Sequence, residues 1–474
     1  MIGITSYGAY IPQTRLSLGA IGGRPAKEGG PERSVAWNDE DSVTMAVTAA
    51  VNCLRGFDRS RVDGVVFAST TYPFREKQGA ALIARALDLR NDIQATDVSS
   101  SLRAGTTALR TAADTVTAGS ASCVLVVASD ARMGAPGSGL ERNGGDGAAA
   151  FLVASDEAKN GLVVATVEGS FAVSDAIVDL WRVDGDPFVH TWEDRFVVQE
   201  GYTPRVVEAV RGYWERNGAD ASTLAKICMY APDARSHAGA VRELGVAKEK
   251  VGDPLFGRLG NAGAAFAPLQ LIAALETAKT GDSILVANYG DGADVLAFAA
   301  TDSIEKLAER RGVAWHLARR RSVANYDKYL KARKLETSEW NGGSNPGLSA
   351  TVHFRERDND LSFRGQRCLG CSAIQFPEQR VCESCFAKDR FEAVRLSDQV
   401  GRVVTFTFDF FFPTPDPPTV VTILDIGGAR VHLQLTNCTP DDVSTGMEVE
   451  FEFRRIHEGG GRPNYYWKGT PVPA

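Results

Sequence analysis

The sequence SCVLVVASDA (122–131) is an uninterrupted apolar run that ends in small or polar residues, and DSILVANYG (282–290) is a second. A strand that is apolar on both faces is typical of a sheet that helices cover on both sides. The Ala-rich stretches DSVTMAVTAAVNCLRG (41–56) and APLQLIAALETAKTG (267–281) have the composition of helices. The alternation predicts an α/β fold with a helix-covered sheet over residues 1–310.

The composition is that of an ordinary globular protein. Of the 474 residues, 44% are hydrophobic and 23% are charged, which predicts two to four domains with real cores. The formal net charge of −7 argues against nucleic acid as a partner, because phosphate binding needs a basic field. No apolar run approaches the ~20 residues that span a bilayer, and we see no signal peptide. We therefore expect a cytoplasmic protein without a membrane partner.

The composition and patterning of the sequence change after residue 310. Residues 311–350 are first basic and helical and then rich in turn residues, so we expect a helical linker. From residue 396 to the end, five β-patterned runs are separated by Pro, Gly and Asp, beginning with GRVVTFTFDFFF and ending with PNYYWKGTPV. Five strands over 396–474 predict a small β-barrel of the OB-fold type.

Between the linker and the barrel, residues 351–395 carry two CxxC pairs. Cys368 and Cys371 form the first pair, and Cys382 and Cys385 form the second. Each pair places two thiolates on one tetrahedral ion, so the four sulfurs close the shell of a structural Zn²⁺ in a zinc ribbon. Four free thiols or a redox pair are the alternatives, and a redox CxxC normally opens a helix in a thioredoxin-like unit.

Several stretches in the first 310 residues resemble the 3-hydroxy-3-methylglutaryl-CoA synthase branch of the thiolase superfamily. The resemblance implies a duplicated α/β/α/β/α domain that is usually dimeric and works on acyl-CoA thioesters. It is carried by SYGAYIP (6–12), NDEDSVTMAVTAA (38–50), DLWR (179–182), GNAGAAFAPLQLIAALETAKTGD (260–282) and NYGDGAD (288–294).

The remainder resembles the zinc-ribbon and OB-fold module once catalogued as a domain of unknown function. The evidence is YDKYLKARK (326–334), RCLGCSAIQFPEQRVCESC (367–385), and the two strand-like runs GRVVTFTF and GMEVEFEF. In that family the module accompanies thiolase-fold enzymes and is thought to guide CoA substrates. The resemblance implies a possible partner enzyme of the thiolase fold.

The cysteine nucleophile of the synthases is absent from the matching motif. The stretch ATDVSSSLRAGTTAL (95–109) aligns with the nucleophile loop and places Leu102 at the cysteine position. Leucine cannot form a thioester, so the acyl-enzyme chemistry of thiolases is missing there. The same helix start contains Ser99, Ser100 and Ser101, and a serine there is either a helix cap or a nucleophile. Ser101 is the candidate nucleophile.

The other reactive groups of the family are also replaced, except one. In AKICMYAPD (225–233), Tyr230 stands at the histidine position, and Thr70 or Thr71 stands where the acidic Glu belongs. We expect His237 to lie on the surface of the following helix. Asn261 matches the family's Asn, which positions the acyl oxygen. Tyr230 is either a general acid–base or a strand-end core residue whose hydroxyl is bonded.

This pattern favours chemistry on an acyl-CoA that needs no acyl-enzyme. Retro-aldol cleavage of a β-hydroxyacyl-CoA is such a reaction, and thiolase-fold aldolases that use tyrosine and pair with a zinc-ribbon/OB partner resemble it. We predict an acyl-CoA lyase of aldol type. The alternatives are a Claisen-type acyltransferase with a serine nucleophile, and a non-catalytic scaffold that channels CoA esters to a partner.

Overall fold

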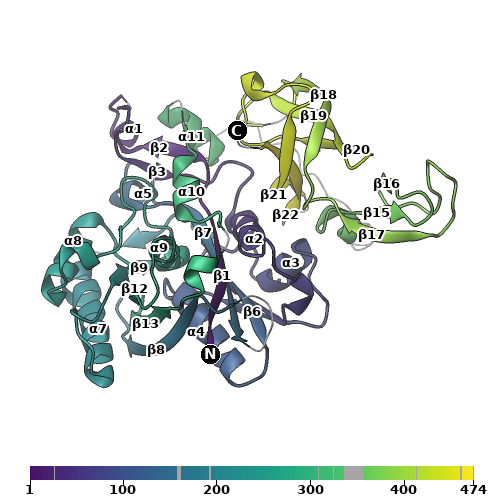
Figure 1. Cartoon of the computed structure of the whole chain (residues 1–474). Helices are drawn as coiled ribbons and strands as arrows, with labels where there is room; N and C mark the ends of the chain where they lie inside the picture. The colour runs from purple at the N-terminus through teal and green to yellow at the C-terminus, as the bar shows by residue number, and fades with distance from the viewer. Residues whose placement is uncertain are drawn as a thin grey trace. The chain divides into compact units, whose positions relative to one another are not determined.

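The computed structural model forms two compact units (Figure 1). The larger unit comprises residues 1–36, 41–84 and 89–326, and the smaller comprises 37–40, 85–88 and 327–474. The structure describes residues 1–25, 27–156, 162–191, 194–307, 309–323, 325–335, 356–412, 414–459 and 462–472. Among these residues, no helix is both long and apolar enough to cross a bilayer.

The larger unit is built around one nine-stranded sheet with the order β11-β12-β13-β8-β1-β7-β6-β4-β5. Its strands are β1 (Ile2–Tyr10), β4 (Gly64–Ala68), β5 (Gln94–Val98), β6 (Cys123–Asp130), β7 (Gly147–Ser155), β8 (Ala165–Ser174), β11 (Lys226–Met229), β12 (Ser283–Tyr289) and β13 (Gly292–Ala300). The apolar runs of the sequence therefore form the buried strands that their patterning predicts, and the α/β fold is confirmed.

The sheet contains the same strand arrangement twice. In the first half β1 pairs with β7 and β7 with β6 in antiparallel fashion, and β6 pairs with β4 in parallel. In the second half β8, β13, β12 and β11 repeat that order and those directions. The halves join where β1 pairs with β8, and β5 adds an outer strand to the first half only. This repetition is the duplication that the family resemblance implies.

Helices form layers on the two halves of the sheet. The main ones are α2 (Ser42–Cys53), α3 (Gly79–Ala86), α4 (Ala104–Thr117), α7 (Thr203–Asn217), α8 (Ala234–Leu244) and α9 (Phe266–Leu275). Helices α4 and α9 pack against each other and against both halves, whereas α2 covers β1 and β7, and α7 covers β8 and β13. Gly105 permits the central contact, because a Cβ there would lie 2.1 Å from the carbonyl oxygen of Ala264.

Short elements complete the larger unit. They are β2 (Thr14–Ser17), α1 (Leu18–Ile21), β3 (Glu32–Ser34), α5 (Gly139–Asn143), β9 (Leu180–Trp181), β10 (His190–Thr191), α6 (Asp194–Phe196), α10 (Val313–Ala318) and β14 (Arg321–Ser322). Helices α10 and α11 (Tyr326–Ala332) fall within the predicted helical linker. The rest of that linker, from residue 336, lies outside the described residues.

The smaller unit contains a three-stranded and a five-stranded sheet. The first pairs β15 (Arg364–Cys368) with β16 (Ile374–Gln375) and β17 (Phe391–Arg395). The second has the order β20-β19-β18-β21-β22, with β18 (Gly401–Asp409), β19 (Thr419–Ile426), β20 (Ala429–Gln434), β21 (Glu448–Gly459) and β22 (Arg462–Pro471). A bridge between Leu435 and Gly469 brings its two outer strands together, so the sheet is nearly a closed barrel, as predicted.

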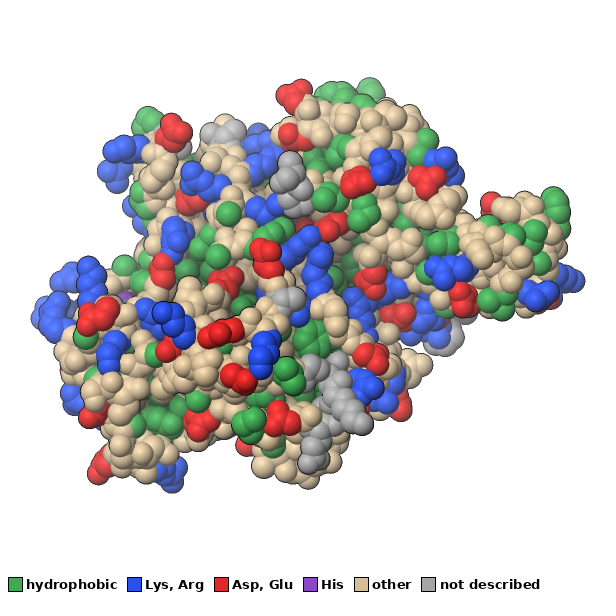
Figure 2. All heavy atoms as spheres, in the orientation of Figure 1, with side chains coloured by type: hydrophobic (Ala, Val, Ile, Leu, Met, Phe, Trp, Pro, Cys, Tyr) green, Lys and Arg blue, Asp and Glu red, His purple; other side chains and the backbone are tan. Residues whose placement is uncertain are grey.

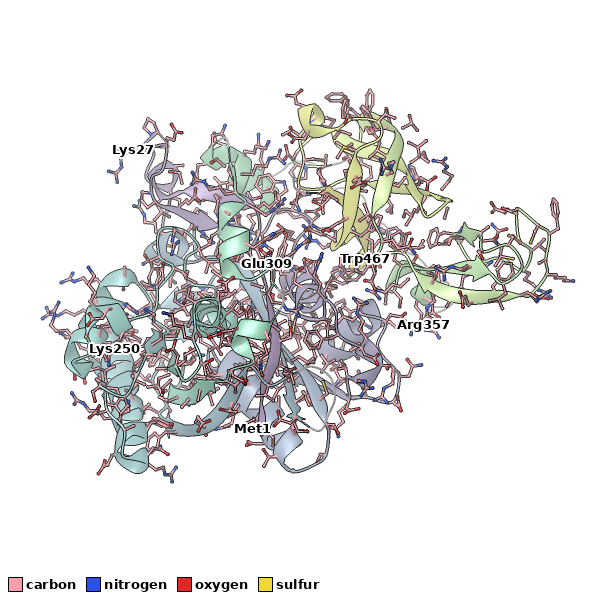
Figure 3. The ribbon with its side chains drawn as sticks, viewed as in Figure 1. Met1, Lys27, Lys250, Glu309, Arg357 and Trp467 are labelled. Carbon is pink, nitrogen blue, oxygen red and sulfur yellow. The ribbon has the colours of Figure 1, made fainter. Side chains whose placement is uncertain are left out.

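An aromatic cluster forms the core of this barrel. Trp467 is 1% exposed and its Nε1 donates to the carbonyl oxygen of Leu361 at 2.9 Å (Figure 3). Phe453 packs edge-on against Trp467, with ring centroids 5.4 Å apart. Outside, Figure 2 shows basic and acidic side chains interspersed over the face in view.

Candidate functional site

Tyr230 and Asn261, which were predicted from separate motifs, line the same cavity of about 190 Å³ in the larger unit. Tyr230 follows the buried end of β11, and its backbone N–H donates to the carbonyl oxygen of Ala287 in β12 at 2.9 Å. Asn261 lies just before α9. The fold therefore brings two residues from different elements to one wall.

The side chains of Asn261 and Arg132 line the same cavity as Tyr230. The residue is only 1% exposed, and burial raises the pKa of its phenol. The charge of Arg132 and the side chain of Asn261 lower that pKa because they stabilise the phenolate, whereas Asp179 raises it, and the pKa remains above its ordinary value. Tyr230 therefore has the neighbouring positive charge that a tyrosine base requires.

Two more tyrosines and an aspartate surround Tyr230. Its ring centroid lies 6.4 Å from that of Tyr202 and 6.2 Å from that of Tyr289, and the Tyr202 hydroxyl donates to the Tyr230 carbonyl oxygen at 2.8 Å. Burial raises the pKa of both neighbouring phenols, and the carboxylate of Asp179 raises that of Tyr289 further. Because the pKa of Tyr230 is raised as well, all three tyrosines are protonated at neutral pH.

The amide of Asn261 is held in one orientation. Its Nδ2 donates to the carbonyl oxygen of Ala231 at 2.9 Å, and its Oδ1 accepts from the backbone N–H of Gly263 at 2.9 Å. Its own backbone N–H donates to the carbonyl oxygen of Asn143 at 2.7 Å. A side chain fixed at both amide atoms presents its remaining N–H at a defined place, as a group that holds an oxyanion must.

Asp130 and Arg132 were not predicted from the sequence, although both follow the apolar run that forms β6. The Asp130 carboxylate is fully buried and accepts from Thr70 (backbone N–H and hydroxyl), Thr71 and the backbone N–H of Ala264 at 2.7–2.9 Å. Asp130 thus fixes the loop in which the family's Glu would stand. The signal that could have identified Asp130 and Arg132 is the occurrence of two charged residues at the end of a buried strand.

Arg132 stands where two cavities meet. It lines the cavity of Tyr230 and Asn261, and also a larger one of about 690 Å³. Gly263 gives it room: φ there is +58°, and a Cβ would lie 2.7 Å from the Cδ of Arg132. The two cavities also share Asp179, Leu180 and Val189.

Leu102 and the three serines line the larger cavity, at the start of α4. The Ser101 hydroxyl donates to the carbonyl oxygen of Gly290 at 3.2 Å and accepts from the backbone N–H of Arg103 at 3.4 Å. Within the part of the chain that the structure describes, both of these partners are backbone groups, so neither is a base. The nucleophilic role of Ser101 stays a prediction.

The expectation that His237 lies on the surface is wrong. His237 is in α8 but is 5% exposed, because its face of the helix packs into the larger unit. Burial lowers the pKa of its imidazole to about 4, so the ring is neutral at physiological pH. It is absent from the described linings of both cavities.

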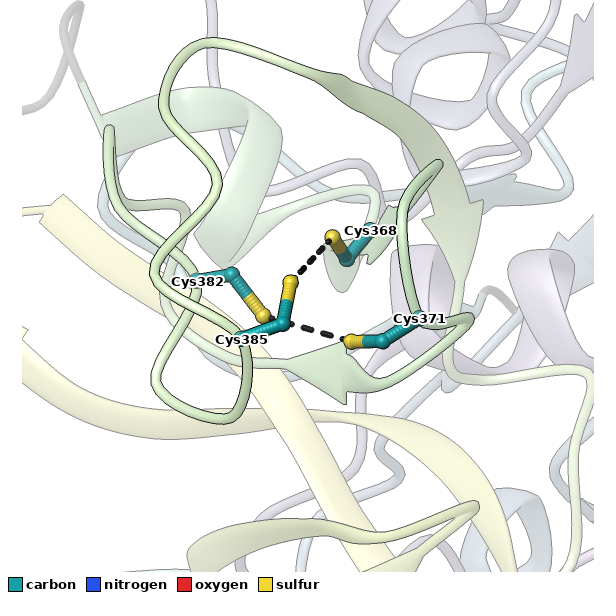
Figure 4. Close-up of side chains that lie close together, drawn as sticks. All are labelled: Cys368, Cys371, Cys382 and Cys385. Atoms are coloured by element: carbon teal, nitrogen blue, oxygen red, sulfur yellow. Dashed lines mark hydrogen bonds between the residues drawn. The ribbon is translucent and has the colours of Figure 1, made fainter.

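The four predicted cysteine ligands converge in the smaller unit (Figure 4). Their Sγ atoms all lie within 4.8 Å of one another; the pair Cys368–Cys385 is 3.5 Å apart and the pair Cys371–Cys382 is 3.6 Å apart. Four thiolates at this spacing fit a tetrahedral Zn²⁺ and leave no open position for a substrate. The donor set therefore supports a structural role for the metal.

The two cysteine turns have the same backbone geometry. The N–H of Ser372 donates to the carbonyl oxygen of Cys368, and the N–H of Phe386 donates to that of Cys382, at 2.8 and 3.0 Å. Ser372 and Phe386 both have positive φ, at 63° and 59°. Each turn thus directs its two sulfurs to one side, and two such turns facing each other make the site.

Known proteins resemble both parts of the chain. Residues 355–391 match the family model described as "ChsH2, rubredoxin-like zinc ribbon domain". The hydroxymethylglutaryl-CoA synthase of Pyrococcus furiosus is 31% identical over 340 residues, which cover 96% of that protein and 70% of this chain. The synthase of Archaeoglobus fulgidus is 30% identical over 347 residues, covering 99% of its length and 70% of this chain.

Solved structures show the same fold. The crystal structure of HMG-CoA synthase complexed with CoA has a TM-score of 0.65 at 20% identity and covers 73% of this chain and 94% of that one. The 3-oxoacyl-[acyl-carrier-protein] synthase III of Aquifex aeolicus has a TM-score of 0.53 at 22% identity, covering 63% and 100%. The chain is a thiolase-superfamily enzyme and belongs to the hydroxymethylglutaryl-CoA synthase family, with a zinc ribbon of the ChsH2 type behind its thiolase-like domain.

Proposed function

We propose that this enzyme cleaves or forms a carbon–carbon bond of aldol type in a β-hydroxyacyl-CoA, without a covalent acyl-enzyme. One observation carries the proposal: a buried tyrosine, an arginine and a fixed asparagine amide line the wall of one cavity. The synthase relatives support a CoA thioester as the substrate. Leu102, at the position of their nucleophile, supports chemistry that bypasses a thioester on the enzyme.

In the cleavage direction, Tyr230 acts first as a base. Tyr230 is protonated at rest because its pKa is raised, and its phenolate form, which the charge of Arg132 stabilises, takes the proton of the β-hydroxyl group. The β-oxygen then forms a carbonyl double bond, and the electron pair of the Cα–Cβ bond passes into the thioester. The products of this step are an aldehyde or ketone and a thioester enolate.

Asn261 then stabilises the enolate. Its amide, fixed by the Ala231 carbonyl oxygen and the Gly263 N–H, offers a preorganised donor to the enolate oxygen. Protonation of the α-carbon by Tyr230 gives the shortened acyl-CoA and restores the phenolate, so the cycle closes without any net proton change. In the synthetic direction the same steps run in reverse.

The direct test is product analysis. Purified full-length enzyme is incubated with a panel of β-hydroxyacyl-CoAs, and free aldehyde or ketone and the shortened acyl-CoA are measured together by mass spectrometry. Equal amounts of the two products support the proposal. Acyl transfer to an added thiol or acyl-CoA, without a free carbonyl product, would instead indicate a serine acyltransferase. Turnover that starts only when a second thiolase-fold enzyme is added would indicate a scaffold.

We also propose that two copies of the chain associate through β5. This strand is at the outer edge of the sheet, and Gln94, Thr96 and Asp97 within it are exposed or half-buried. An edge strand presents unpaired backbone groups that a second copy can satisfy. Sedimentation analysis that shows a dimer, and a monomer after Thr96→Pro, would support this arrangement; a dimer that persists in Thr96→Pro would argue against it.

A further inference from the structure

The helical segment that leads into α7 contains a π-turn. This turn, η3 (Val197–Tyr202), lies between α6 and α7, and the backbone N–H of Thr203 donates to the carbonyl oxygen of Val198, five residues earlier. Hydrogen bonds in an α-helix instead join residues that are four apart. π-Helices are rare, occur mostly as single turns within α-helices and are frequent at functional sites. The turn is therefore a candidate for a functional role.

The π-turn brings residues that are five apart to one side of the helix. Val197 and Tyr202 are both buried, and both line the cavity of about 190 Å³ that Tyr230 and Asn261 also line. In an α-helix, which turns by about 100° per residue, residues at this spacing would point about 140° apart. The extra residue in the turn therefore allows Val197 and Tyr202 to face this cavity together.

Tyr202 is hydrogen bonded to the backbone of Tyr230. Its side chain is 0% exposed, and its hydroxyl donates to the Tyr230 carbonyl oxygen at 2.8 Å. The Tyr230 N–H donates to the carbonyl oxygen of Ala287 in β12 at 2.9 Å. Both backbone polar groups of Tyr230 are thus satisfied, one by the sheet and the other by Tyr202. The two bonds hold the backbone of Tyr230 from opposite sides of the residue.

Ring packing holds Tyr202 in this position. Its ring packs edge-on against those of Tyr230 and Tyr289, with centroids 6.4 and 5.5 Å apart. Gly201, the preceding residue of the π-turn, lies directly against Tyr289, because a Cβ there would be 2.5 Å from the Tyr289 hydroxyl oxygen. A larger residue at 201 would displace the Tyr289 side chain. The π-turn and the three tyrosines therefore pack as one cluster.

We infer that Tyr202 is a positioning residue for Tyr230, and that the π-turn is the element that brings it to this cavity. A general acid–base must lie within hydrogen-bond reach of the atom whose proton it takes, so a small displacement of Tyr230 slows the reaction. Tyr202 acts through the backbone of Tyr230 and transfers no proton itself. This inference rests on the proposed function and adds the residue that orients its central group.

The first measurement compares Tyr202→Phe with a matched control, Tyr213→Phe. Tyr213 is also buried, lies in α7 and is absent from the described linings of both cavities. With the most active β-hydroxyacyl-CoA of the panel, Tyr202→Phe should lower kcat by about ten- to a hundredfold while KM changes little. Tyr213→Phe should leave kcat unchanged. Equal losses of kcat in the two variants would overturn the inference.

A double-mutant cycle distinguishes positioning from a general structural effect. If Tyr202 acts through Tyr230, adding Tyr202→Phe to Tyr230→Phe should change the residual kcat by less than about twofold, because the hydroxyl that Tyr202 positions is already absent. The single and double variants are compared at saturating substrate. If the two losses of kcat multiply, Tyr202 acts independently of Tyr230 and the inference is wrong.

A measurement without turnover separates a failure of this inference from a failure of the proposed reaction. Hydrogen–deuterium exchange of the full-length enzyme reports on the peptide 225–233, which includes the Tyr230 N–H. This peptide should exchange about tenfold faster in Tyr202→Phe, since a hydrogen bond that holds it is lost, and at the wild-type rate in Tyr213→Phe. Faster exchange in an enzyme that cleaves no member of the panel would refute the aldol reaction and support the contact of Tyr202; unchanged exchange would refute the positioning role.

Discussion

Gly290 closes over the turn that contains Leu102. A Cβ on Gly290 would lie 3.1 Å from the Cβ of Leu102 and 2.9 Å from the Oγ of Ser101, so only a glycine leaves this turn room at the start of α4. The sequence resemblance places the nucleophilic cysteine of the synthases on this turn, where this chain has Leu102. Two predictions depend on that replacement.

No acyl group should accumulate on this turn. When the enzyme is incubated with a radiolabelled acyl-CoA and then denatured, the peptide 95–109 should carry no label. The reason is that the Ser101 hydroxyl is hydrogen bonded to backbone groups and has no base among its described partners. Digestion and peptide counting check this. Stable label on Ser99, Ser100 or Ser101 would support the serine acyltransferase instead.

Restoring the thiol alone should not restore thiolase chemistry. In Leu102→Cys the new thiol would lack the histidine that the sequence resemblance places at the position of Tyr230, so it would remain largely protonated and a poor nucleophile. Thiolase activity of Leu102→Cys should stay at background in a standard thiolysis assay, and Leu102→Ala serves as the control for the change in volume. Clear thiolysis by the cysteine variant alone would show that another base is in reach.

Much of this architecture could be predicted from patterns that depend on local sequence. Continuous apolar runs predict buried strands, and the CxxC spacing predicts the sulfur cluster, because each depends on a few adjacent residues. The nearness of Arg132 to Tyr230 could not be predicted, because Arg132 follows β6 and Tyr230 follows β11, and five strands separate these two in the sheet order. His237 was misplaced because helical periodicity does not say that a second layer covers that face. The domain boundaries at 310, 350 and 395 stay predictions, which limited proteolysis can test.

The four cysteines should hold one zinc that is needed for folding and not for chemistry. Elemental analysis should find about one zinc per chain, because a closed set of four sulfurs binds a single tetrahedral ion. Cys371→Ser should lower soluble yield and Tm before it lowers the specific activity of the folded fraction, and Cys438→Ser, outside the cluster, is the matched control. A metal-free protein whose smaller unit keeps its near-ultraviolet circular dichroism would refute a structural zinc.

Stability should fall as the pH drops below the ordinary pKa of histidine. Burial lowers the pKa of His316 to about 3, whereas an unfolded histidine titrates near about 6.5, so the unfolded chain binds the proton first. The free energy of unfolding therefore decreases as the pH falls from about 6.5 towards 3. Asp294 acts in the opposite direction, because burial raises its pKa to about 6 and the folded chain keeps that proton.

A variant isolates the histidine contribution to this pH dependence. The Tm of His316→Gln should decrease less than that of the wild type between about pH 7 and pH 5, because the variant lacks the buried imidazole that stays neutral in the folded state. This comparison of slopes does not depend on any difference in Tm at neutral pH. His432→Gln, at an exposed position in β20, should keep the wild-type slope. Identical slopes in all three proteins would show that His316 does not contribute.

Asn261→Ala should slow catalysis because it weakens the stabilisation of the enolate. Loss of one fixed donor to the enolate oxygen is expected to lower kcat by about 10²–10³-fold. KM should change much less, because the interaction forms fully only as the charge develops. Steady-state kinetics check this split, and Asn217→Ala, at an exposed position at the end of α7 and outside both cavities, is the control. A rise in KM with unchanged kcat would mean that Asn261 binds the ground state only.

The most direct test of the account is the kcat of Tyr230→Phe for carbonyl release from a β-hydroxyacyl-CoA. The substitution removes the hydroxyl, whose pKa Arg132 and Asn261 lower, and keeps the ring that packs against Tyr202 and Tyr289. If Tyr230 is the acid–base group, kcat should fall by about 10²–10⁴-fold while Tm changes little. Full activity in folded Tyr230→Phe would contradict the account.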